Sequence, residues 1–236
     1  MARDILILVI VAIRIVVGAS LIRAARRNDE RNLFWLAGVF FATGVFNIFF
    51  TERVARNLLL GMSGLLLAQL ALVMFIRHTF YRDRRSPFGL FLGISLLGGA
   101  AVIVVGGRGD TDTGLVLTGI VSTFNWAWHT VVAYQANRVI RAGESVEDWV
   151  KGRYQLVIAY CVSMALTAIF TGVSPWLTNR LLQLLVLLNT IVGLVLQFLA
   201  WVMPEGFRQY LNRNYQAAQD IAALSEEEIM EQLQGQ

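Results

Sequence analysis

The sequence predicts an all-α polytopic integral membrane protein with seven transmembrane helices, an outer N-terminus and a cytoplasmic C-terminus. Three observations lead to this fold class. Hydrophobic residues make up 56% of the 236 residues and charged residues only 15%, a balance typical of chains whose solvent is the bilayer. Seven separate stretches are long and apolar enough to cross it. Basic residues collect in alternate connections between these stretches.

Each of the seven stretches has about 18 residues or more with at most one charge, and a rise of ~1.5 Å per residue carries such a helix across a ~30 Å hydrocarbon core. The stretches are residues 5–22, 33–50, 57–76, 87–107, 114–137, 154–173 and 179–203. We therefore expect a seven-helix membrane domain over residues 1–203, followed by a cytoplasmic surface helix and acidic tail over residues 204–236.

The first stretch begins at Ile5 without a basic leader or a small-residue cleavage pattern, and it carries Arg14 at its middle. These features disfavour a cleaved signal peptide, so we expect the stretch to remain as the first helix. The single cysteine, Cys161, lies within the sixth stretch, which excludes an intrachain disulfide.

The fourth stretch contains small residues four positions apart, in Gly89-x-x-x-Gly93 and in Ser95-x-x-x-Gly99. This spacing predicts close backbone packing against another helix of the bundle or against a second copy of the chain. The connection after it, residues 106–114, is rich in Gly and Asp, which predicts a tight polar turn.

The basic residues predict the orientation, because short loops rich in Lys and Arg stay on the cytoplasmic side. One set of connections holds Arg23, Arg26, Arg27, Arg31, Arg77, Arg82, Arg84, Arg85, Arg138, Arg141, Lys151, Arg153, Arg208 and Arg213. The opposite set holds only Arg3, Arg53, Arg56, Arg108 and Arg180. We therefore expect a multi-pass protein of the cell membrane whose positive charge faces lipid headgroups and not nucleic acid.

Several seven-helix functions require side chains that this sequence lacks. Retinal proteins need a lysine in the last helix, but the only lysine is Lys151, in a connection. Zinc-dependent lipid hydrolases need several His and acidic ligands, whereas the chain has two histidines, His78 and His129, and no Asp or Glu within any stretch. Pumps that use embedded carboxylates are disfavoured for the same reason. We expect no enzymatic chemistry, no metal and no cofactor.

Polar side chains inside the stretches are the candidate ligand contacts, because a polar group that faces lipid is costly. In the fifth stretch Ser122, Asn125, Trp126 and His129 share one helical face, which we interpret as a pocket wall. Interhelical hydrogen bonding is the alternative for each residue, and His129 is either a satisfied interior histidine or a titrating one. The predicted ligand-binding residues are Arg14, Asn47, Gln69, Asn125, Trp126, His129, Tyr160 and Thr190.

Arg14 is the only charged side chain near the middle of a stretch, a position that costs about 2.5 kcal/mol or more without compensation. Three interpretations stay open. Arg14 bonds to amide or backbone carbonyls or to Glu52, it binds an anionic lipid or fatty-acid headgroup, or it extends to the interface.

After the seventh stretch, Pro204 can start a new helix, with Phe207, Tyr210 and Leu211 on one face. This pattern predicts a short helix on the cytoplasmic membrane surface. The acidic segment from Ser225 to Leu233 opens with a capping-box start and is either a solvated tail or a docking peptide for a cytoplasmic or membrane protein partner.

The helix count, the orientation, the short loops and the exit sequence Trp201-Val-Met-Pro204-Glu-Gly-Phe207-Arg208 resemble the seven-helix membrane sensor modules that precede bacterial histidine kinases. The resemblance covers the full set of spans and implies a sensor-like role. No output domain follows here, so we expect any output to act in trans.

The sequence therefore favours a receptor-like or accessory membrane protein that binds a small or lipidic ligand and signals through a partner. A small-solute transporter is one alternative, although the Pro-Gln motif of PQ-loop sugar transporters is missing and helices one to three show no convincing similarity to helices five to seven. A structural subunit of a larger membrane complex is the other.

Overall fold

The computed structural model describes residues 2–50, 58–81, 85–142, 147–177 and 179–213. Within these residues the chain forms α1 (Ala2–Asn28), α2 (Asn32–Asn47), η1 (Ile48–Phe50), α3 (Leu58–Phe80), α4 (Phe88–Gly107), α5 (Thr111–Ala142), α6 (Asp148–Val173), η2 (Ser174–Trp176) and α7 (Arg180–Val202). Residues 205–213 form a further helix. The all-α prediction is confirmed.

Six of the described helices are long and apolar enough to cross a membrane, so the chain is an all-helical, multi-pass membrane protein. The exception is α2, whose 16 residues extend only about 24 Å. A single 3₁₀ turn, η1, prolongs it. α2 nevertheless packs against both α1 and α3 inside the bundle.

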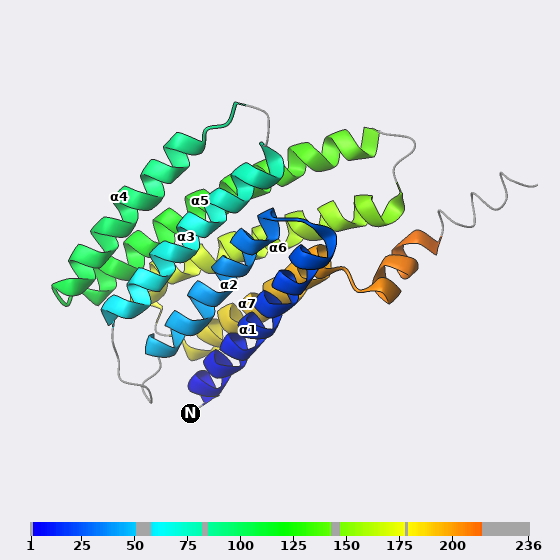
Figure 1. The fold of residues 1–236 in the computed structure, drawn as a ribbon. Helices are drawn as coiled ribbons and strands as arrows, with labels where there is room; N and C mark the ends of the chain where they lie inside the picture. Colours follow the sequence, from blue (N-terminus) through cyan, green and yellow to red (C-terminus); the bar gives the residue numbers. More distant parts are fainter. Residues whose placement is uncertain (1, 51–57, 82–84, 143–146, 178, 214–236) are drawn as a thin grey trace, which may run out of the picture.

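Successive helices run up and down through the bundle and pack on their neighbours in the sequence (Figure 1). We call the end where α1 begins the N-terminal end and the opposite end, where residues 205–213 lie, the C-terminal end. α7 closes the bundle by packing against α1. α4 lies at the edge of the bundle, against α3 and α5.

Local chemistry sets the helix ends at the N-terminal end of the bundle. Gly109 has φ of 86°, a conformation that glycine adopts without strain, and the Asp110 carboxylate accepts the Thr113 amide, so the tight turn predicted for residues 106–114 is confirmed. Pro175 in η2 follows the end of α6, and the Asn179 side chain caps α7 by accepting the amide of Leu181.

Four of the described helices, α1, α3, α5 and α6, are longer than the apolar stretches that predicted them. α5 has 32 residues, about 48 Å, and α6 has 26 residues, about 39 Å, both beyond a ~30 Å core. Their additional turns lie largely at the C-terminal end of the bundle and carry polar and charged residues. A helix need not end where its apolar stretch ends.

Small residues determine how closely the helices pack. A Cβ at Gly99 would lie 2.1 Å from the Leu66 side chain, so Gly99 lets α4 approach α3. The intrachain interpretation of this small-residue pair is therefore the one observed. Gly89 and Gly93 have nothing within 4 Å of a built Cβ and pack on no described neighbour.

Some predictions fall on residues that the structure does not describe. They concern Glu52 as a partner for Arg14, the basic positions Arg53, Arg56, Arg82 and Arg84, and the acidic segment over residues 225–233.

The α5–α6 contact provides a stability test. A Cβ at Gly119 would lie 2.4 Å from the Gly172 Cα and 2.9 Å from the Ala168 carbonyl oxygen, both backbone atoms that cannot rotate away. We expect Gly119→Ala to lower the free energy of unfolding by about 1–3 kcal/mol, measured by thermal unfolding in detergent. Gly89→Ala is the matched control and should be neutral or slightly stabilising. Equal stability of the two variants would contradict this packing.

Candidate functional site

The bundle contains a half-open cavity of about 320 Å³ in the half nearer its N-terminal end. Its wall contains residues from six helices, and α4 contributes none of the described lining. The polar lining residues are Arg14, Thr43, Asn47, Gln69, Thr118, Ser122, Thr167, Thr171, Thr190 and Gln197. Phe40, Trp126, Met164 and aliphatic side chains complete the wall.

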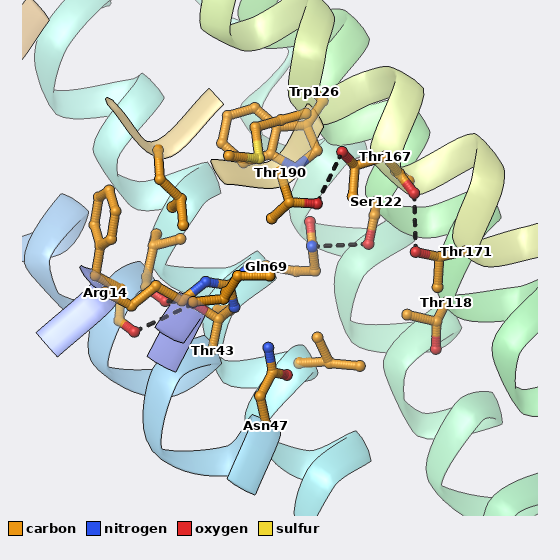
Figure 2. A pocket seen from close by; sticks show the side chains of 18 of the residues that line it. Arg14, Thr43, Asn47, Gln69, Thr118, Ser122, Trp126, Thr167, Thr171 and Thr190 are labelled. Carbon is orange, nitrogen blue, oxygen red and sulfur yellow. Dashed lines mark hydrogen bonds between the residues drawn. The ribbon is translucent and has the colours of Figure 1, made fainter. Parts of the chain in front are cut away.

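Arg14 is the only charged residue in the described lining. Its side chain extends from α1 toward Thr43 and Gln69 (Figure 2). Gly44 on α2 makes room for the arginine, because a Cβ at Gly44 would lie 3.1 Å from the Arg14 Cβ. The Nε and Nη1 atoms are buried and have no hydrogen-bond partner among the described residues. The cavity wall therefore contains a cation with two buried donors that no described residue satisfies.

A hydrogen-bonded network lies beside the cavity and joins three helices. Gln69 on α3 donates to Ser122 on α5 at 2.9 Å, as Figure 2 shows. Asn125 donates to the Gln69 carbonyl at 2.9 Å and to Ser95 on α4 at 2.8 Å. These bonds hold the Gln69 amide at the edge of the cavity. Its orientation is fixed by Ser122 and Asn125.

A buried aromatic cluster fills the bundle on the C-terminal side of the cavity. The Trp201 indole N–H donates to the Tyr160 hydroxyl at 2.9 Å, and that hydroxyl lies 3.3 Å from His129 Nε2. Trp201 can only donate, whereas the donor of the Tyr160–His129 hydrogen bond depends on the histidine tautomer. Phe75 and Phe80 pack edge-on against the His129 ring.

The structure divides the predicted ligand-binding residues into two groups. Arg14, Asn47, Gln69, Trp126 and Thr190 line the cavity. Asn125, His129 and Tyr160 are buried in the network and in the aromatic cluster, outside the cavity lining.

The predicted stripe on the fifth helix divides in the same way. Ser122 and Trp126 line the cavity, whereas Asn125 and His129 bond or pack with other helices. One helical face thus meets two environments: His129 lies beyond the cavity, and Asn125, at the same depth as Ser122 and Trp126, bonds to α3 and α4.

Sequence reasoning omitted Gln197 from the predicted set. Gln197 on α7 is 2% exposed and lines the cavity, and its amide nitrogen has no hydrogen-bond partner among the described residues. Its signal was the seven-residue spacing with Thr190 and Gln183. Gln183, however, bonds to the Leu177 carbonyl and is not part of the cavity wall.

A polar contact at the C-terminal end fastens residues 205–213 to the start of α6. We call Glu147, Trp149, Arg208 and Asn212 the clasp. The Asn212 amide donates to Glu147 at 2.9 Å, and its carbonyl accepts the Trp149 backbone amide at 3.2 Å. The Trp149 indole also donates to Glu147, and the Arg208 guanidinium lies 4.3 Å from the Trp149 ring centre.

Comparison with known proteins finds no matching family model, no matching curated protein and no matching solved structure. The fold and the site therefore define the class directly: an all-helical membrane protein with an internal, arginine-containing cavity. Among the described residues, no three His, Cys, Asp or Glu side chains gather as a metal site would require.

The clasp predicts a pH-dependent contact. The Asn212 amide, then the Trp149 indole and the Arg208 charge, hold the pKa of the Glu147 carboxyl below its usual 4.5. A carboxylate with a lowered folded-state pKa stabilises the contact above pH 4.5, and this contribution is lost as the pH falls through the folded value. We expect the protection factors of the amides of residues 205–213, which are exchange rates corrected for the intrinsic effect of pH, to fall as the pH drops below 4.5, measured by hydrogen exchange.

Two variants complete this test. Glu147→Gln should lower the protection factors at neutral pH and remove their dependence on acid. Asp148→Asn is the control, since the Asp148 carboxylate contacts Lys151 on its own helix. An unchanged acid profile in Glu147→Gln would show that another group controls the helix.

Proposed function

We propose that this chain is a receptor-like or accessory membrane protein that holds a small or lipidic ligand in its central cavity and acts through a partner. The observation that carries the proposal is Arg14, a cation with unbonded donors in a cavity of about 320 Å³ within a membrane bundle. Known small-molecule sites have volumes of ~300–1,000 Å³ and combine apolar walls with a few polar groups. This cavity likewise combines an apolar wall with a limited number of polar side chains.

The packing on the C-terminal side of the cavity favours ligand binding over transport. Leu21, Phe75 and Tyr160 are fully buried in the half of the bundle near its C-terminal end, where Trp201 closes the aromatic cluster. A solute that moved through the bundle would have to displace these side chains. A ligand that stays in the cavity, on the N-terminal side of these side chains, needs no such rearrangement.

The C-terminal end is the surface on which we expect a partner to act. A polar recess of about 900 Å³ lies there between α1, α7 and residues 205–213. Arg23, Arg27 and Arg208 line it. The clasp lies beside the recess, so a movement of residues 205–213 would change this surface. The acidic tail stays a second candidate contact.

We further propose that all seven helices span the membrane, with the N-terminus outside and the C-terminus in the cytoplasm. In a Cys161→Ala background, an impermeant thiol reagent added to intact cells should label Arg108→Cys and not Arg31→Cys. The two sites separate the alternatives because, if α2 does not cross, Arg108 lies on the same side as Arg31. Protection of both positions would therefore remove α2 from the spans.

The ligand proposal predicts a molecule that the cavity retains. We expect native mass spectrometry of protein purified from its own membrane to show a bound small molecule. Ala168→Phe places a ring in the cavity wall and should abolish this adduct, because Ala168 is buried and lines the cavity. Ala100→Phe on the exposed side of α4 is the matched control and should keep the adduct.

Two results would contradict the proposal. Identical adducts in the two folded phenylalanine variants would place the molecule outside the cavity. A wild-type protein with no adduct, and with no gain in unfolding temperature from any added amphiphile, would leave the cavity without a binding role.

A further inference from the structure

The buried, unbonded polar atoms of the cavity wall are all hydrogen-bond donors. Among the described lining residues they are Arg14 Nε, Arg14 Nη1 and Gln197 Nε2. The buried acceptors without partners, Asn125 Oδ1 and Asn137 Oδ1, belong to residues outside the lining. These three donors favour a ligand that accepts hydrogen bonds.

The threonine hydroxyls of the wall do not change this balance. Thr43, Thr118, Thr171 and Thr190 each donate to a carbonyl of their own helix, at 2.7–2.9 Å. Their protons are thus engaged, so these hydroxyls offer the cavity no free donor. The buried donors without partners in the wall lie on α1 and α7.

The two donor residues lie on the deep side of the cavity. Arg14 and Gln197 are the lining residues of α1 and α7 that lie furthest from the N-terminal end. Elsewhere the wall mixes polar and apolar residues, with Asn47 near the N-terminal end and Phe40 deeper on the same helix. The aromatic cluster packs the bundle on the C-terminal side of the cavity, so the tail of a ligand whose head group meets these donors has room only toward the N-terminal end.

The charge of Arg14 and the volume of the cavity limit the chemical class of the ligand. A single cation in a low-dielectric site is neutralised by one negative charge, whereas a dianion would leave a buried excess charge. The volume of about 320 Å³ lies at the lower end of the ~300–1,000 Å³ range of known small-molecule sites, which favours a carboxylate with one medium-length chain over a diacyl phospholipid.

We propose that the ligand is a single-chain carboxylate whose head group is held between Arg14 on α1 and Gln197 on α7, with its tail directed toward the N-terminal end. This inference rests on the proposed function, since it names the ligand of the same cavity. Hydrogen bonds to charged groups are the stronger ones, so Arg14 supplies most of the affinity and Gln197 adds a second donor.

Decanoate, decanol and decylamine are suitable probes because they share a chain and differ in head group. We expect the wild-type protein in detergent to bind decanoate saturably at one site and about tenfold more tightly than decanol, measured by native mass spectrometry over a concentration series. Decylamine should bind more weakly than decanol. Ala168→Phe should remove the saturable binding of all three.

Two variants test the residues. Arg14→Gln should remove the preference for decanoate over decanol, and Gln197→Leu should reduce it about threefold to tenfold. Gln155→Leu is the matched control, because Gln155 is exposed on α6 and should leave the preference unchanged. Gln197→Glu should abolish decanoate binding, since its carboxylate would occupy the same donors. This last variant also tests the site if Arg14→Gln does not fold.

The outcomes separate this inference from the proposed function. Saturable binding of decanol equal to that of decanoate would overturn the carboxylate head group while leaving the ligand-binding cavity in place. A decanoate preference that survives both Gln197→Leu and Gln197→Glu would remove Gln197 from the site. No saturable binding of any probe would overturn the medium-chain ligand, and the native-adduct comparison of Ala168→Phe with Ala100→Phe would then decide the cavity independently.

Discussion

A polar side chain in the hydrocarbon core must find its partner within the protein, and the arrangement of this bundle follows from that constraint. Asn125 donates to both Gln69 and Ser95, which ties α3, α4 and α5 together at one level. Ser163 and Asn189 do the same for α6 and α7, with three bonds of 2.9–3.1 Å. Each such bond contributes only ~0.6 kcal/mol, so the helix registers depend on their number and on close packing at residues such as Gly119.

Arg14 departs from this pattern, because its buried Nε and Nη1 atoms have no partner among the described residues. A purely structural role would place such a residue against a carboxylate or at the interface, since the mid-membrane position costs about 2.5 kcal/mol or more. The bundle instead provides Gly44 beside the Arg14 side chain and leaves a cavity in front of the guanidinium. An accommodated but unpaired cation is more consistent with binding than with folding.

Much of the fold could be predicted because transmembrane helices depend on local composition. The seven apolar stretches correspond to α1–α7, and the small-residue pair at Ser95 and Gly99 packs inside the bundle. The ends of α5 and α6 could not be predicted from hydropathy, since a helix continues as far as its backbone bonds and caps allow. The length of α2 was overestimated because η1 replaces its last turn.

The candidate site was predicted only in part. Helical periodicity identifies the face to which Ser122 and Asn125 belong, but it does not say where along that face the cavity ends. The place of Gln197 in the cavity wall could not be predicted, because it depends on the register between α1 and α7. These helices lie at opposite ends of the sequence and become neighbours only when the bundle closes. The clasp joins Glu147 to Asn212 across 65 residues, a contact that no local pattern reports.

The position of Gln197 suggests how a ligand could act at a distance. Trp201 follows one turn later on α7 and is bonded to Tyr160, so Gln197 and the aromatic cluster belong to the same rigid segment. The helix ends at Met203, whose φ of 42° redirects the chain into Pro204 and residues 205–213, which the clasp holds against α6. A ligand changes this geometry only if it binds one arrangement of α1 and α7 more tightly than another. A head group held between Arg14 and Gln197 meets that condition, because its affinity depends on the α1–α7 distance.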